Sequence, residues 1–177
     1  MPKRIGRPPK STPFIHADDG SVIAVASNGR QFFVDDTDAD LLRFAWKCQR
    51  NRYVTRTIYA NGEYKHETMH RVIMERVAGR PLLNSECIDH IDGDGFNNRR
   101  SNLRIASQSQ NMANSRLSKA NRSGFKGVYR YGHKWRACLS GKNLGSFLTP
   151  EEAHAAYCAA ALEKYGEFAN FGDNQHG

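Results

Sequence analysis

The stretch 87-CIDHIDGDGFNNRRSNLRIASQSQNMAN-114 decides the fold of this chain. It places an Asp-His pair, Asp89 and His90, directly before a loop rich in glycine, asparagine and arginine. An Asn-Leu pair and a short apolar run follow the loop. Polar loops are common, but acids, an imidazole, amides and guanidinium groups seldom gather in one hairpin unless they meet a phosphate. The stretch therefore predicts a hairpin that handles phosphate.

Hydrolysis of a phosphodiester needs a base for the attacking water, a cation near the leaving oxygen, and a phosphate that is held still. His90 can be the base because an imidazole titrates near neutral pH. Asp89 can hold a hard divalent ion such as magnesium, which prefers oxygen ligands and keeps several waters. One carboxylate and one amide oxygen then suffice, and the amide must come from elsewhere in the fold.

The same stretch resembles the HNH endonuclease motif in the form found in phage and intron homing endonucleases. The resemblance implies a ββα-metal fold, in which two strands and a helix surround one divalent metal ion, magnesium or manganese. It assigns Asp89 as a metal ligand and His90 as the general base. It also assigns Asn102 to tie the loop to the backbone near the base, and Asn111 as the metal ligand on the helix. Asn114, one turn further on, could take the place of Asn111.

The residues around the Asp-His pair carry further expectations. Neighbouring residues on a regular strand point to opposite faces, so the strand must end or distort for Asp89 and His90 to reach one phosphate. Phosphate contacts, with a solvated loop as the alternative, are expected from Arg71, Arg99, Arg100 and Arg104. His70 either packs against the site, contacts DNA or is held by a structural hydrogen bond.

The composition of the chain favours a nucleic-acid partner. Its 177 residues carry a formal net charge of +8 and a pI near 9.5, and basic proteins of this size most often bind nucleic acid. No apolar run approaches the roughly 20 residues that span a bilayer, so no membrane association is expected. The four cysteines lie far apart without a CxxC pair, which favours reduced thiols in the cytoplasm.

The chain is expected to be an α+β protein with two domains. A nuclease domain is expected at 14–116, a basic linker at 117–123, a second domain at 124–172 and a tail at 173–177. The arm 1–13 is basic and proline-rich and is expected to be disordered. Its "GRPPK" resembles an AT-hook, which would place Arg7 in the narrow minor groove of A·T-rich DNA. The alternative is a solvated basic tail.

Local patterns predict the elements of residues 14–116. "VIAVAS" and "QFFVDD" are typical of strands, and Asn61-Gly62 predicts a β-hairpin between two alternating runs. "DADLLRFAW" predicts a short helix, with one face formed by Leu41, Leu42, Ala45 and Trp46. "MHRVIMERVAG" predicts a helix that ends at Gly79, with one face formed by Val72, Ile73, Arg76 and Val77. A polar helix is expected at about 107–115.

Residues 124–172 predict three short strands and then a helix. The strands "GFKGVYRY", "KWRACLS" and "KNLGSFL" are separated by turns that contain glycine. The helix has Thr149 as its N-cap, Pro150 at its first position, Glu152 in a capping box and Gly166 at its end. Alternation on the second strand places Trp135, Ala137 and Leu139 on the helix side, and Arg136, Cys138 and Ser140 outside. The inner face of the helix is expected from Ala153, Ala156, Tyr157, Ala160 and Leu162 to Tyr165.

Residues 124–171 resemble the plant APETALA2-type DNA-binding domain through "KGV", the tryptophan of "KW", "LGSF", the "EEAHAAYCAAA" helix and the closing "NF". The resemblance implies a three-stranded antiparallel sheet packed on a helix, with the open sheet face in the major groove. The base-reading positions of the plant domains differ here, so their sequence preference does not carry over. The DNA contacts expected from this domain are Lys126, Tyr129, Arg130, Tyr131, Lys134, Arg136 and Lys142. The alternative is a protein-interaction module.

Together these patterns predict a site-targeted DNA endonuclease that uses one divalent metal ion and His90. The resemblance implies a homing endonuclease of a mobile element or phage, acting on double-stranded DNA in the cytoplasm of a bacterial host. Neither a small-molecule substrate nor a membrane is expected. The alternative is a non-cutting DNA-binding transcriptional regulator on an inactive nuclease scaffold, with RNA as a disfavoured partner. Cleavage of one strand or both, and a monomer or a dimer on DNA, stay open.

Overall fold

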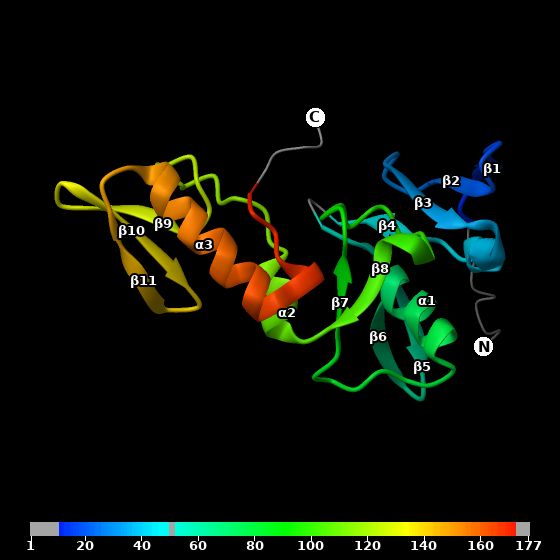
Figure 1. The fold of residues 1–177 in the computed structure, drawn as a ribbon. Helices are drawn as coiled ribbons and strands as arrows, with labels where there is room; N and C mark the ends of the chain where they lie inside the picture. Colours follow the sequence, from blue (N-terminus) through cyan, green and yellow to red (C-terminus); the bar gives the residue numbers. More distant parts are fainter. Residues whose placement is uncertain (1–10, 50–51, 173–177) are drawn as a thin grey trace, which may run out of the picture. The chain divides into compact units, whose positions relative to one another are not determined.

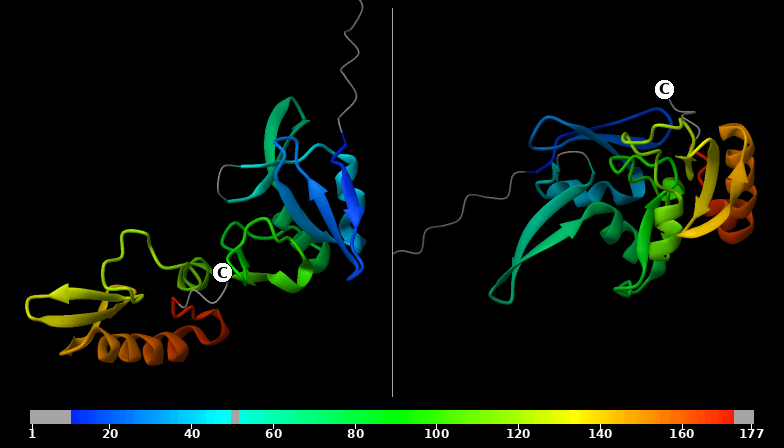
Figure 2. Two further views of the ribbon diagram at one scale, coloured as in Figure 1. Left: turned by 90° about the horizontal axis from the view of Figure 1, so that it is seen from above. Right: turned by 90° about the vertical axis from the view of Figure 1, so that its left-hand side faces the viewer.

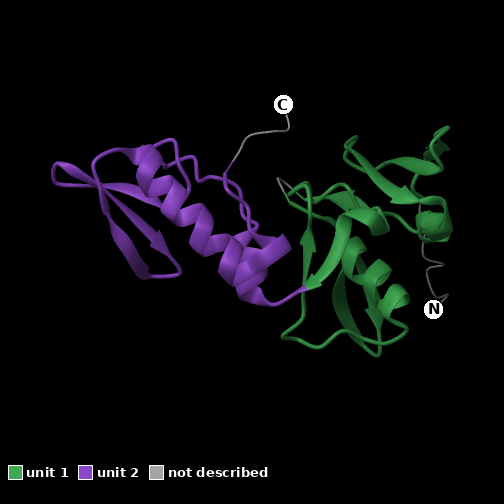
Figure 3. Cartoon of the chain, viewed as in Figure 1, with its two compact units in different colours: residues 1–105 green, residues 106–177 purple. Residues whose placement is uncertain are grey.

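The computed structural model describes residues 11–49 and 52–172, and the chain divides into two compact units, residues 1–105 and 106–177 (Figure 3). Both units mix strands with helices, in agreement with the expected α+β class. Arg7, in the arm that resembles an AT-hook, lies outside the described residues. Among the residues that are described, no helix is both long enough and apolar enough to cross a bilayer.

Within its described residues, the first unit contains three small sheets (Figure 1), with the strand orders β1-β2-β3, β4-β5-β6 and β7-β8. The strands are β1 (Phe14–His16), β2 (Ser21–Val25), β3 (Gln31–Asp35), β4 (Lys47–Cys48), β5 (Val54–Ala60), β6 (Glu63–Thr68), β7 (Cys87–His90) and β8 (Leu103–Ala106). The helices are the 3-10 helices η1 (Asp36–Arg43) and η2 (Arg100–Asn102) and the α-helix α1 (Met69–Ala78). β8 crosses the boundary between the units.

The β5–β6 hairpin follows from its turn residues. Asn61 and Gly62 have φ values of 53° and 84°, the left-handed conformations that a two-residue type I′ turn requires. The strands pair from Thr55 opposite Thr68 to Ala60 opposite Glu63. The hairpin predicted from Asn61-Gly62 is confirmed, and Figure 2 shows it extending beyond the rest of the first unit.

Two helices of the first unit differ from their predicted form. "DADLLRFAW" forms the 3-10 helix η1, which ends at Arg43 before an extended Phe44. A 3-10 helix has three residues per turn, so its side chains do not line up as they would on the predicted α-helix. Ala45, which was expected on the buried face, lies beyond the helix end and is exposed. Trp46 is buried beyond the helix end, where its indole nitrogen donates a 2.8 Å hydrogen bond to the Leu41 carbonyl oxygen.

The helix α1 ends at Gly79 as predicted, with a left-handed φ of 65°. Its buried face was predicted only in part. Ile73 is buried and Val72 packs against the core as predicted, but Val77 is 51% exposed, and Met69 and Met74 enter the core instead. The side chains at these positions pack with Phe32 and Trp46 in one core cluster. The helix thereby fixes the end of β6 against the centre of the unit.

The second unit consists of α2 (Gln108–Ala113), β9 (Val128–Tyr131), β10 (Lys134–Leu139), β11 (Lys142–Phe147), α3 (Pro150–Tyr165) and the 3-10 helix η3 (Gly166–Phe168). The three strands form an antiparallel sheet in the order β11-β10-β9, and α3 packs on one face of it (Figure 1). Thr149 and Glu152 form the predicted capping box at the start of α3.

The inner face of α3 is narrower than predicted. Its buried residues are Ala153, Tyr157, Ala161 and Tyr165, an i, i+4 row that faces one side of a helix. Ala160 lies beside this row, and Leu162 is 58% exposed. The prediction that Ser140 points away from the helix side is wrong. Ser140 lies in the β10–β11 turn with a φ of 50°, and its hydroxyl contacts the hydroxyl of Tyr165 on α3 at 2.6 Å.

Candidate active site

Asp89 and His90 are the last two residues of β7. The chain turns immediately after them, because the Gly93 amide donates a 2.8 Å hydrogen bond to the His90 carbonyl oxygen. Gly93 has a φ of 69°, which glycine adopts at little cost. Asp89 and His90 are both buried, at 3% and 6% exposure. The strand therefore ends at this pair, as the sequence predicted.

The imidazole of His90 lies among aromatic rings. It stacks on Tyr53 at a centroid distance of 6.0 Å and meets the His70 ring edge-on at 5.2 Å. Burial lowers the pKa of His90 below its ordinary value, and contact with Asn98 and nearby carboxylates opposes part of that shift. A lowered pKa leaves the imidazole neutral at neutral pH, which is the form that accepts a proton.

His70 packs against this site from the start of α1. Its ring lies 4.8 Å from the Tyr53 ring, and its Nε2 is 3.2 Å from the Thr68 hydroxyl. Burial, with the neighbouring charges of His90 and Arg71, lowers the pKa of His70 to about 3. Of the roles left open for His70, the structure shows packing against the site and a hydrogen-bond contact.

Sequence reasoning missed two residues of this site. Tyr53 precedes β5 and lies far from the motif, so no local pattern linked it to His90. Asn98 is completely buried beside His90. The signal that could have found it is the Asn97-Asn98 pair inside the motif, since amides in a buried loop usually hold a neighbouring polar group.

Asn102 fixes the loop that follows His90. Its Oδ1 accepts a 3.0 Å hydrogen bond from the Asp92 amide, and its Nδ2 donates to Asp92 Oδ1 and to the Asn97 carbonyl oxygen at 2.9 and 2.8 Å. Asp92 also accepts from the Asp94 amide at 2.7 Å. Asp92 is therefore engaged in forming the turn.

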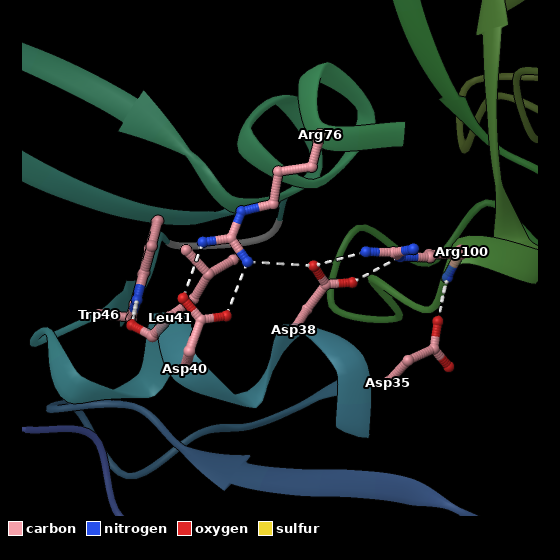
Figure 4. A network of polar contacts seen from close by, with 7 residues as sticks. All are labelled: Asp35, Asp38, Asp40, Leu41, Trp46, Arg76 and Arg100. Carbon is pink, nitrogen blue, oxygen red and sulfur yellow. Dashed lines mark hydrogen bonds and ion pairs between the residues drawn. The ribbon is translucent and has the colours of Figure 1, made fainter. Parts of the chain in front are cut away.

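The loop is anchored on the N-terminal part of the unit. Its backbone pairs with Phe33 of β3 through hydrogen bonds of 2.9 and 2.8 Å. Arg100 donates from Nε to Asp38 at 2.8 Å and from its amide to Asp35 at 2.7 Å. Asp38 is completely buried and also contacts Arg76 of α1 at 3.3 Å (Figure 4). This carboxylate joins η1, α1 and the loop.

The four arginines expected to contact phosphate are engaged inside the first unit. Arg104 donates from Nε and Nη2 to Asp89 Oδ2 at 2.9 and 2.8 Å, and Arg100 holds Asp38. Arg71 and Arg99 donate to a backbone carbonyl and a serine hydroxyl, at 2.6 and 3.0 Å. These guanidinium groups support the fold here, and their phosphate contacts stay predictions.

Comparison with known proteins places this site in a family. The family profile described as HNH endonuclease matches residues 67–113, which include β7, the loop and α2. Protein 3.8 of Escherichia phage T7 is 31% identical over 113 residues, which are 61% of this chain and 93% of that protein. This chain belongs to the HNH endonuclease family.

A second relative of this chain is the uncharacterized HNH endonuclease L560 of Acanthamoeba polyphaga mimivirus. It is 31% identical over 103 residues, which are 57% of this chain and 54% of the mimiviral protein. The chain thus spans about half the length of that relative. No solved structure matches the chain. The resemblances of residues 124–171 to APETALA2-type domains and of the N-terminal arm to an AT-hook have no support from these comparisons and stay predictions.

HNH endonucleases generally use a divalent metal ion, and Asp89 fits such an ion. Its carboxylate is the oxygen donor that magnesium and manganese prefer. Among the residues that the structure describes, no three side chains of His, Cys, Asp or Glu gather as a metal cage. The donor set therefore suits an ion that keeps waters and takes oxygen from a phosphate. Asn111 lies in the other unit, so its part in this HNH site stays a prediction from the sequence.

The second unit of this HNH protein exposes tyrosines and basic residues on its sheet. Tyr129 and Tyr131 are 44% and 54% exposed. The Arg136 guanidinium lies 3.3 Å from the centroid of the Tyr131 ring, and the Tyr129 hydroxyl is 3.2 Å from Cys138 Sγ. The predicted placement of Arg136 and Cys138 on the open face agrees with these contacts. Arg136 is half-buried, and the exposed basic residues on the strands of this sheet are Arg130, Lys134 and Lys142.

Lys126 differs from the other basic residues of the second unit. Its Nζ donates hydrogen bonds of 2.6 Å to the carbonyl oxygens of Ala113 and Ser115. Burial lowers the pKa of Lys126 to about 8. The ammonium group thus ties the segment after α2 to the start of the sheet, an arrangement that does not favour its expected contact with phosphate.

Proposed function

We propose that this chain is a DNA endonuclease that hydrolyses phosphodiester bonds with one divalent metal ion and His90 as the general base. The observation that carries the proposal is the pair at the end of β7, where a buried carboxylate and a buried imidazole of lowered pKa occupy adjacent residues. The carboxylate suits a metal ion, and the neutral imidazole suits removal of a proton from water. Membership of the HNH endonuclease family supports this assignment.

The proposed chemistry gives each group one task. His90 takes a proton from the attacking water, whose oxygen bonds to phosphorus as the bond to the 3′ oxygen breaks. The 3′ oxygen leaves with a proton, so the products carry a 5′-phosphate and a 3′-hydroxyl. The resemblance to the HNH motif assigns Asp89 and Asn111 to a metal ion, magnesium or manganese, which would supply positive charge beside the phosphate. Asn102 keeps the loop after His90 in place.

The second unit is proposed to bring the nuclease to its site on double-stranded DNA. Its exposed tyrosines, with Lys134, Arg136 and Lys142, supply aromatic and cationic groups on one sheet. Several modest contacts on one chain raise the effective concentration of each of the others. A homing endonuclease of a phage, acting in the cytoplasm of a bacterial host, fits this arrangement, and the phage T7 relative supports it.

The test is cleavage of a plasmid by the purified full-length protein with magnesium, beside His90→Ala. The variant is expected to lose cleavage while it binds DNA as tightly as the wild type. His66→Ala is the matched control, because His66 lies on the exposed strand β6 and contacts Thr57, and it should cut normally. Cleavage by His90→Ala would place the base elsewhere. DNA binding without any cleavage by the wild type would favour the non-cutting regulator.

A further inference from the structure

Arg104 of β8 and Asp89 of β7 form a buried ion pair. The two donor nitrogens of Arg104 lie 2.9 and 2.8 Å from Asp89 Oδ2, and the side chains are 15% and 4% exposed. The strands pair in a two-stranded sheet and run in opposite directions in Figure 1, with a 2.9 Å hydrogen bond from the Ile91 amide to the Asn102 carbonyl oxygen. Asp89 lies two residues before Ile91 and Arg104 two residues after Asn102, so in this antiparallel pairing they lie opposite each other across the sheet.

A carboxylate as deeply buried as that of Asp89 needs a counter-charge, because an ion is costly to hold away from water. Arg104 meets this need with a guanidinium that stays charged at every ordinary pH. A divalent cation bound to Asp89 would meet the same need. Two cations beside one carboxylate repel each other, and the repulsion is stronger where little water screens it.

We propose that Arg104 is an internal counter-ion of Asp89 that competes with the metal ion, so that it stabilises the metal-free protein and weakens metal binding. The inference rests on the proposed function, since it takes Asp89 as the carboxylate that holds the metal. Arg104 thereby has a role at Asp89 that differs from the phosphate contact predicted from the sequence.

The experiment measures Mn²⁺ binding to the full-length, metal-free protein by isothermal titration calorimetry. Arg104→Gln keeps a polar side chain but removes the competing charge. Its Kd for Mn²⁺ should therefore be about tenfold lower than that of the wild type, which corresponds to about 1.4 kcal/mol of binding free energy. The variant should also unfold at a lower temperature without metal. Because a ligand stabilises the state that binds it, Mn²⁺ should then raise the unfolding temperature of Arg104→Gln more than that of the wild type.

Three further variants serve as controls. Arg104→Lys keeps the positive charge and should bind Mn²⁺ within about threefold of the wild type. Arg80→Gln removes a positive charge elsewhere in the first unit, where Arg80 pairs with Glu86 at 2.7 Å, and should leave the Kd unchanged. Asp89→Asn should abolish Mn²⁺ binding.

The outcomes separate this inference from the proposed function. If Arg104→Gln binds Mn²⁺ no more tightly than the wild type while Asp89→Asn has lost binding, the competing role of Arg104 is wrong and the metal site stands. Unchanged binding by Asp89→Asn would overturn both. Should Arg104→Gln fail to fold without metal, circular dichroism must show that Mn²⁺ restores its fold, and no recovery would overturn the inference.

Discussion

The amide side chain of Asn102 holds the loop beside the proposed base. It is 8% exposed and bonds the Asp92 amide, the Asp92 carboxylate and the Asn97 carbonyl oxygen. Its removal leaves buried polar groups without these bonds, at about 1–3 kcal/mol for each group. We expect Asn102→Ala to lower the free energy of unfolding by about 3 kcal/mol and to reduce plasmid cleavage. Urea denaturation and the cleavage assay measure the two effects.

Asn28→Ala is the matched control for Asn102→Ala. Asn28 donates a 2.7 Å hydrogen bond to the Cys48 carbonyl oxygen in another part of the first unit. Its loss should cost about 1 kcal/mol and leave cleavage unchanged. Equal losses of stability in the two variants would contradict the role given to Asn102.

Lys126 provides a test by pH. Burial lowers its pKa from 10.5 to about 8, so between these values the unfolded chain holds a proton that the folded protein has released. The contribution of Lys126 to stability therefore rises with pH through this window, and the neutral amine keeps N–H donors for the Ala113 and Ser115 carbonyls. The unfolding free energy of the wild type minus that of Lys126→Met should therefore increase from about pH 7.5 to about pH 10. A constant difference in urea denaturation at these two pH values would contradict it.

The packing of α3 on its sheet depends on a close approach at Gly127. Gly127 has a φ of 71°, and a Cβ atom placed there would overlap the Tyr157 ring. Gly132, in the β9–β10 turn, has a φ of 60° with open space around it. We expect Gly127→Ala to lower the free energy of unfolding by about 3 kcal/mol and Gly132→Ala by about 1 kcal/mol. Thermal unfolding of both variants measures the two losses of stability. Equal losses would argue against the close packing of Tyr157 on Gly127.

Turn and cap residues made several elements predictable from the sequence. Asn61-Gly62 predicted its hairpin because few residue pairs accept two successive positive φ values, and Thr149 and Glu152 predicted the start of α3. The buried faces were less predictable. In α3, alanines lie on nearly every side, so the sequence shows too little contrast between inside and outside to exclude Ala160.

The candidate site was predictable where its residues lie within one short stretch of the sequence. Asp89 and His90 adjoin each other, and the loop after them already indicated that β7 ends there. Arg100 looked like a phosphate ligand because its partner Asp38 lies far away in the chain, and no local pattern joins the two. Such pairs form only when the whole unit folds. The sequence therefore predicted phosphate contacts for Arg100 and Arg104, whereas the structure shows both holding carboxylates.

The net charge of +8 predicts that DNA binding by the full chain weakens as salt rises, because each phosphate contact releases counter-ions. If the open sheet face supplies such contacts, Lys134→Ala with Arg136→Ala should weaken binding and reduce the slope of log K against log salt by about 2, roughly one for each contact. The control, Lys65→Ala with Arg80→Ala, removes the same charge from the first unit. Fluorescence anisotropy over a salt series measures both slopes. Since the two double variants share one net charge, equal slopes would mean that overall charge draws the chain to DNA, and the sheet would not be its DNA-contacting surface.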